Sequence, residues 1–214
     1  MIRVLTNEVF KEYADELIRA QIFLVPDSFL SKLGNDFLYR YYREIVNSDY
    51  CKGFIYIHEG KLAGYITATK DVYRLMTNAI RKSFARIIIG SFLMLFELLK
   101  LFFYAFFNKD ENVSATKAEL TTFGVLPEYR KVTLDGPSVI SKELLKNAID
   151  WFKNEGVEQV RVGTKNNNKR MNNLITRAGF KVLYAFKNPV TEYEDGERNF
   201  MWILELKEKT CITR

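Results

Sequence analysis

The chain has 214 residues, enough for one domain with a sizeable core, and its 48% apolar and 14% aromatic content excludes an intrinsically disordered protein. The formal net charge of +6 favours a polyanionic or phosphorylated partner, such as nucleic acid, a nucleotide cofactor or a membrane surface. A solvated basic face that binds nothing explains the same charge equally well.

Cysteine usage and the start of the chain indicate the compartment. Cys51 and Cys211 lie far apart and lack metal-ligand spacing, which argues against a disulfide framework or a metal site and suits a reducing cytosol. The first residues, MIRVLTNEVFKEYADEL, contain acidic side chains and no apolar core, so they do not form a signal peptide. We therefore expect a cytoplasmic protein.

The first part of the chain predicts a strand followed by two helices. Residues 2–5 form the strand, and Asn7 caps a helix whose apolar residues recur at helical spacing. The second helix begins near Asp27 or Ser28 and carries a broad apolar stripe as far as residue 46. We interpret most of its aromatic side chains as core.

A β-hairpin comes next. Two β-rich runs, 54–58 and 62–69, are joined by a tight turn that contains glycine. His58, the only histidine, lies beside this turn, where side chains are usually exposed. A general base needs a positioned partner, and the sequence identifies none for His58, so we do not favour a catalytic role.

Residues 70–115 contain basic side chains followed by an apolar run at 87–107. The run is long enough to span a bilayer, but Glu97 and Lys100 near its middle and the strands predicted on both sides argue against a span. We expect one or two apolar helices over 71–107. They could form a lid over an acceptor site, a homodimer interface or a peripheral membrane contact, and plain core packing is the simplest alternative.

The segment that begins at residue 118 predicts a strand at 119–125, a basic loop that includes Arg130 and Lys131, and an amphipathic helix at 138–155. Free N–H groups at a helix start beside basic side chains suit a phosphate, although most strand–loop–helix units bind nothing. The remaining predicted elements are strands at 157–163, 180–186 and 199–206, the last two antiparallel, and a helix from 166–168 to about 178.

Three segments together resemble the acyl-CoA-binding core of the GCN5-related N-acetyltransferase (GNAT) family: AELTTFGVLPEYRK, VEQVRVGT and NNNKRMNNLITRAGFKV. Gly64 matches a glycine that family members often carry in the second strand of the hairpin. The resemblance implies a mixed α/β fold, with a twisted and mostly antiparallel sheet flanked by helices. We expect one such domain over residues 1–214, with an apolar helical insertion at about 70–115.

The resemblance also implies a site for acetyl-CoA. The residues it assigns to cofactor binding are Phe123, Gly124, Val125, Arg130, Lys131, Thr133, Gly136, Ser138 and Asn168. The strand backbone would hold the thioester and pantetheine, and the loop after Arg130 would hold the pyrophosphate. That loop lacks the two glycines that the family places after the arginine. Either its own polar residues replace the lost contacts, which we favour, or CoA binding has weakened or gone.

Glu119 is the candidate general base, because its place on the strand resembles that of a catalytic glutamate in several family members. A strand-edge carboxylate paired with a basic side chain is an equally good interpretation. The tyrosine that often protonates the leaving thiolate is replaced by Ile175, and the sequence identifies no substitute. Asn168 heads the last helix, where it could contact the cofactor, cap the helix, or do both.

The resulting functional hypothesis is an enzyme that transfers an acetyl group from acetyl-CoA, without a metal, to an amine of a small molecule. An amino-sugar or polysaccharide precursor is the suggested acceptor. The alternative is a catalytically degenerate acetyltransferase fold that binds a partner or membrane through residues 87–107. Nucleic-acid binding is not favoured, because no recognisable motif accompanies the positive charge.

Overall fold

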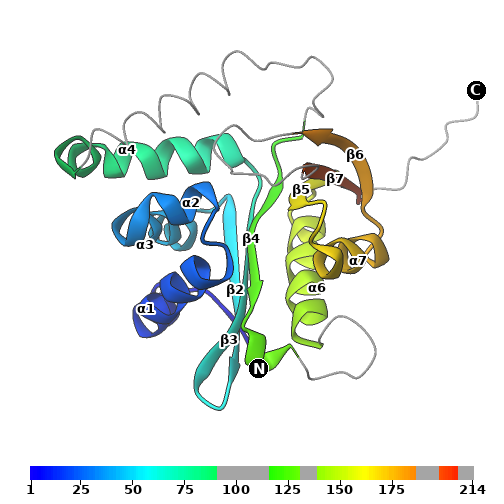
Figure 1. The fold of residues 1–214 in the computed structure, drawn as a ribbon, viewed down its shortest axis with the longest axis horizontal. Helices are drawn as coiled ribbons and strands as arrows, with labels where there is room; N and C mark the ends of the chain where they lie inside the picture. Colours follow the sequence, from blue (N-terminus) through cyan, green and yellow to red (C-terminus); the bar gives the residue numbers. More distant parts are fainter. Residues whose placement is uncertain (91–115, 131–138, 187–197, 207–214) are drawn as a thin grey trace, which may run out of the picture.

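The computed structural model describes residues 1–90, 116–130, 139–186 and 198–206, with backbone alone for 84–90. Within them a seven-stranded sheet has the order β1-β2-β3-β4-β5-β7-β6, and its only parallel neighbours are β4 and β5. Helices α1 to α3 lie on one side of the sheet and α6 on the other (Figure 1). The predicted mixed α/β fold is confirmed.

The N-terminal part consists of β1 (Ile2–Val4), α1 (Asn7–Leu24), α2 (Phe29–Lys32) and α3 (Gly34–Asn47). The cap of α1 is Thr6 and not Asn7, because the Thr6 hydroxyl accepts a hydrogen bond from the Val9 N–H at 3.4 Å. The single helix predicted from Asp27 or Ser28 is interrupted at Gly34, whose φ of 82° is left-handed. Two helices therefore replace the one expected.

The predicted hairpin is present as β2 (Cys51–His58) and β3 (Lys61–Thr69). Both turn residues, Glu59 and Gly60, have positive φ values of 49° and 76°. Such a turn matches the right-handed twist of the strands that it joins.

Helix α4 (Val72–Gly90) lies within the segment 71–107 where apolar helices were predicted, and the assignment of that segment as an insertion stays a prediction. Helix α4 packs on α3, where the buried carboxylate of Glu44 accepts hydrogen bonds from Lys82 and from Asn78 of α4, the latter at 2.8 Å. Most of the apolar run at 87–107 lies outside the described residues. Among the described helices, none combines the length and the apolar character needed to cross a membrane.

The C-terminal half contains the unit on which the resemblance rests. Its elements are β4 (Glu119–Val125), the 3-10 turn η1 (Pro127–Tyr129), α6 (Val139–Asn154), β5 (Gln159–Lys165), α7 (Lys169–Arg177), β6 (Lys181–Phe186) and β7 (Asn199–Glu205). The last two strands pair antiparallel, as predicted.

Two apolar cores lie on opposite faces of the sheet. One joins α1 and α3 to β2 and β3 around side chains such as Leu17, Tyr42 and Ile55. The other joins α6 to the sheet around Leu144 and Phe152. The two cores hold β3 and β4 at the centre of the molecule, with a helical layer on each side (Figure 1).

Candidate active site at the divergence of two parallel strands

β4 and β5 are paired over only a short length. Their register contains Glu119 with Arg161 and Leu120 with Val162, and no later residue of β4 is paired with β5. On its other side β4 stays paired with β3 as far as Val125. From Thr121 onward, one edge of a central strand is therefore open to a ligand that can take up its backbone hydrogen bonds.

A β-bulge occurs at the point of divergence. Thr67 of β3 pairs with Thr122, and Ala68 pairs with Leu120, so that Thr121 is the additional residue on β4. A bulge bends its strand and increases the local twist, which accounts for β4 leaving β5 here. It also lets Thr121 and Thr122 both bond to Thr67, a residue of the α1–α3 face, although strand neighbours normally alternate between faces.

Hydroxyl groups form a connected network at this bulge. The Tyr41 hydroxyl, from α3, donates to the Thr121 Oγ1 at 2.7 Å, and Thr121 Oγ1 lies 2.8 Å from Thr67 Oγ1. Thr67 Oγ1 also lies 2.5 Å from Thr122 Oγ1 and accepts from the Thr122 N–H at 3.1 Å. Burial raises the pKa of Tyr41 well above its ordinary value, so its hydroxyl stays protonated and available as a donor.

Glu119 lies two residues before the bulge residue Thr121 and pairs with Thr69 of β3 and Arg161 of β5. Its Oε2 accepts a hydrogen bond from the Arg161 Nε at 2.7 Å, and both side chains are largely buried. Burial raises the pKa of Glu119, and the charge and hydrogen bond of Arg161 oppose that rise. Arg161 lies in turn 5.5 Å from the ring centre of Tyr73 on α4, so helix α4 contacts this ion pair. The interpretation of Glu119 as a carboxylate paired with a basic side chain thus describes its contact, while its role as base stays a prediction.

Phe123, Gly124 and Val125 form the open part of β4. A Cβ at Gly124 would lie 2.5 Å from Leu24 Cδ1 and 2.9 Å from the ring of Tyr65, so only glycine lets β4 approach α1 and β3 this closely. At Gly64, opposite Val125, a Cβ would lie 2.9 Å from the Gly124 carbonyl oxygen. These two glycines allow the close packing of the strand that lines the site.

Arg130 follows η1, and its Nε donates to the carbonyl oxygen of Val125 at 2.8 Å. Partial burial and the nearby positive charge of Arg170, in α7, lower the pKa of Arg130. Arg130 therefore lies at the open part of β4, and the positive charge of Arg170 acts on it, which gives this region a positive potential suited to an anion. Lys131, Thr133, Gly136 and Ser138 lie outside the described residues, and their predicted role remains a prediction.

Asn168 is the N-cap of α7, where its Oδ1 accepts from the Met171 N–H at 3.2 Å. This bond fits the capping role expected from the sequence and leaves its cofactor contact untested. Ile175 is fully buried in the core beside α6, so the position where the resemblance implies a tyrosine is a packing position here.

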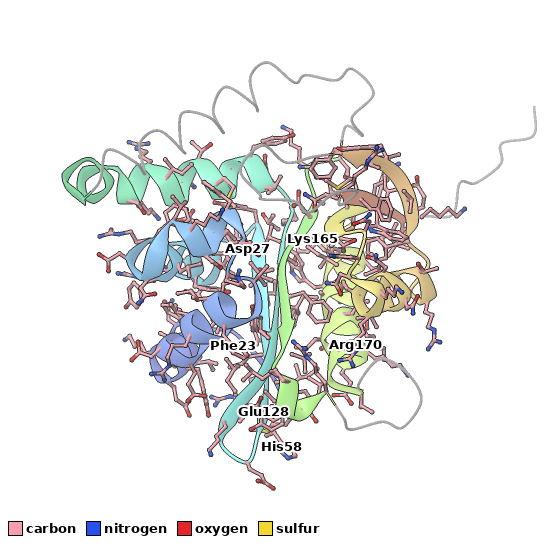
Figure 2. All side chains as sticks on the ribbon, in the orientation of Figure 1. Phe23, Asp27, His58, Glu128, Lys165 and Arg170 are labelled. Carbon is pink, nitrogen blue, oxygen red and sulfur yellow. The ribbon has the colours of Figure 1, made fainter. Side chains whose placement is uncertain are left out.

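Figure 2 labels His58 and five other side chains around the central strands. His58 and Glu128 lie at the hairpin end of the sheet, whereas Asp27 and Lys165 lie farther from that end, on opposite sides of β3 and β4 (Figure 2). His58 contacts the ring of Tyr129 edge-on with a centroid distance of 5.5 Å, and its side chain is half exposed. Phe23, at the end of α1, is 66% exposed beside β4 (Figure 2).

The sequence did not identify four of these residues: Tyr41, Thr121, Arg161 and Arg170. Tyr41 is one of several aromatic residues in its helix and is buried like a core residue, but its hydroxyl reaches a residue 80 positions later. Arg161 stands between Val160 and Val162 in an alternating strand, and nothing in the sequence around it indicates that Glu119 is its partner. A double threonine in a β-rich run is the only hint of the bulge.

Comparison with known proteins agrees with this geometry. The model of the Acetyltransferase (GNAT) family matches residues 19–180. No curated protein matches the chain. Among solved structures, the ribosomal-protein-S18-alanine N-acetyltransferase of Escherichia coli shares 13% identity with a TM-score of 0.58, covering 100% of this chain and 98% of that one.

Two further structures are comparably similar. The ribosomal-protein-alanine N-acetyltransferase of Brucella melitensis has a TM-score of 0.61 at 12% identity, covering 96% of this chain and 99% of that one. The aminoglycoside 6'-N-acetyltransferase of Enterococcus faecium has a TM-score of 0.59 at 11% identity and covers 98% of each chain. These likenesses establish the fold, and the family match extends over most of the sequence. The chain belongs to the GNAT acetyltransferase family.

Proposed function

We propose that this protein transfers an acetyl group from acetyl-CoA to an amine of a small molecule. The observation that carries the proposal is the divergence of β4 from β5 after Leu120, with two arginines near the open edge. An open strand edge can hydrogen-bond the amide-containing pantetheine chain, and positive side chains can bind its phosphates. Acetyl-CoA supplies both groups and the activated acetyl carbon.

The described residues fit this ligand. The backbone of Phe123, Gly124 and Val125 would bind the pantetheine arm, while Arg130 and Arg170 would bind phosphate oxygens. The Val125 carbonyl holds the Nε of Arg130, which leaves the terminal nitrogens of the guanidinium for an anion. Holding the thioester beside the attacking amine can by itself contribute several kcal/mol to catalysis.

The acceptor side carries the groups that an amine requires. Glu119 would accept the proton that the amine loses, and its raised pKa makes it a better base than an exposed carboxylate. Arg161 would hold this carboxylate in position. Asp27 is exposed on the α1–α3 side of the sheet and offers a second negative charge to a cationic acceptor (Figure 2). Within this class we propose an amino-sugar or polysaccharide precursor as the first acceptor to test.

Calorimetric titration with acetyl-CoA tests the proposal. We expect micromolar binding in the wild type and at least a tenfold loss in Arg130→Ala and Arg170→Ala, because each removes a charged hydrogen-bond donor worth about 1.5–3 kcal/mol. Arg177→Ala is the matched control: it removes an exposed arginine from the other end of α7, and binding should not change.

The result that would overturn the proposal is the absence of binding at millimolar acetyl-CoA. That outcome would favour the alternative function, in which the fold serves as a partner- or membrane-binding module. Equal losses in all three variants would instead indicate a nonspecific effect of charge and would remove the assignment of Arg130 and Arg170.

A further inference from the structure

The hydroxyl network at the bulge reaches the open edge of β4 through Thr121. Thr121 is the first residue of β4 beyond the last pair with β5, and it is only partly buried. Thr67 and Thr122, the other threonines of the network, are buried. Any group bound where the strands diverge would therefore meet Thr121 before the other members of the network.

The capacity of each hydroxyl for hydrogen bonds can be counted. A threonine hydroxyl has one hydrogen to donate and two lone pairs that accept. Thr67 uses all three, with Thr121 Oγ1, Thr122 Oγ1 and the Thr122 N–H. Thr121 makes two hydrogen bonds, to Tyr41 and Thr67, and so has capacity for one more.

Whether Thr121 can donate or accept its third hydrogen bond depends on which hydroxyls of the network are donors. Tyr41 donates to Thr121 and thereby occupies one of its lone pairs. If Thr122 donates to Thr67, then Thr67 accepts twice and must give its own hydrogen to Thr121. Both lone pairs of Thr121 are then filled, and its own O–H is left to donate.

We propose that the Thr121 hydroxyl, oriented by Tyr41 and Thr67, donates a hydrogen bond to the carbonyl oxygen of the acetyl thioester. Thr121 is then a catalytic residue, and Tyr41 is a positioning residue that acts through it. The inference rests on the proposed function. Its chemical effect is to stabilise the negative charge that develops on this oxygen when an amine attacks, without any transfer of the threonine proton.

With Thr122 donating to Thr67, the Thr121 O–H is in place to donate before the substrate arrives, which suits that task. A donor aimed at a developing charge is most effective when it does not have to reorient. Tyr41 is anchored in the core of α3, and burial keeps its hydroxyl protonated, so the network cannot relax by losing a proton. Glu119, two residues before Thr121 on β4, would deprotonate the amine while Thr121 polarises the carbonyl.

Isotope-edited infrared spectroscopy of bound acetyl-CoA labelled with 13C at the carbonyl tests this inference without an acceptor. In the wild type the carbonyl stretch should lie at lower wavenumber than in Thr121→Val, which has the same shape but no hydroxyl. Thr121→Ser should retain the wild-type stretch, and Tyr41→Phe should give an intermediate value. Tyr13→Phe and Thr176→Val, whose hydroxyls bond to Gly60 and Asn172, are controls that should not change it.

The same variants predict a kinetic result. Loss of one such donor typically lowers kcat by 10²–10³, so the rate of CoA release should fall by roughly that factor in Thr121→Val while acetyl-CoA affinity is retained. Identical carbonyl stretches in wild type and Thr121→Val would overturn the inference and leave the proposed function intact. Loss of the shift in Thr121→Ser would also overturn it, since geometry and not the hydroxyl would then be responsible. A wild type that shows no bound spectrum would overturn both proposals.

Discussion

Glu44 of α3 binds two side chains of helix α4, and replacing it should lower the stability of the folded protein by an amount that depends on pH. Its carboxylate is 5% exposed and accepts hydrogen bonds from Lys82, from the Tyr50 hydroxyl at 2.7 Å and from the Asn78 Nδ2 at 2.8 Å. Burial alone would raise the pKa of Glu44. The bonds from Lys82, Tyr50 and Asn78 outweigh burial and lower the pKa from 4.5 to about 2.

This shift has a calculable effect on stability. At about 1.4 kcal/mol per pKa unit, the ionised carboxylate stabilises the folded protein by at most about 3.5 kcal/mol at pH 7, because solvent screens the half-exposed Lys82. The folded protein binds the Glu44 proton more weakly than the unfolded chain does. The stabilisation is therefore complete above the unfolded pKa and is lost as pH falls from about 5 to about 2.

Urea unfolding of Glu44→Gln beside the wild type measures this effect. We expect the variant to lose about 3 kcal/mol of unfolding free energy at pH 7, and the difference to shrink by about 2 kcal/mol at pH 3. Glu12→Gln, which breaks the exposed ion pair with Arg3, is the control and should cost less than about 1 kcal/mol at either pH. A Glu44→Gln penalty that is the same at both pH values would refute the electrostatic account of this residue.

Two further predictions concern the site itself. Gly124→Ala should destabilise the protein by about 1–3 kcal/mol and weaken acetyl-CoA binding, because the new Cβ would lie 2.5 Å from Leu24 Cδ1. Gly163→Ala on β5 is the control and should be tolerated, because a Cβ there would meet no atom within 4 Å. Equal denaturation curves for the two variants would contradict this prediction. Arg161→Ala should lower the free energy of unfolding by about 3–5 kcal/mol, because it leaves Glu119 buried without its partner. In thermal unfolding, the double variant Arg161→Ala/Glu119→Gln should recover part of that loss. A double variant no more stable than the single one would argue against the ion pair.

Much of the framework could be predicted from the sequence because it depends on local patterns. The strand at 119–125 was predicted with its observed bounds, and the helix expected at 138–155 is observed at Val139–Asn154. Alternating and helical periodicities, together with turn residues such as Gly60 and Gly156, carry that information.

What the sequence did not reveal depends on contacts between distant segments. Nothing near Glu119 indicates that Arg161 lies beside it, because that pairing is set by the crossover through α6. The bulge at Thr121 requires knowledge of the register with β3, and Tyr41 resembles any other aromatic of an apolar helix face. The break at Gly34 was missed because the apolar stripe continues on both sides of it.

The central claim is that acetyl-CoA binds along the part of β4 that has left β5. Backbone amide chemical shifts of 15N-labelled protein, recorded during titration with acetyl-CoA, test it most directly. We predict the largest shift changes at Thr121, Thr122, Phe123, Gly124 and Val125, with little change in β1 or β2. Shift changes that avoid these five residues, or saturating acetyl-CoA that produces none, would contradict the account.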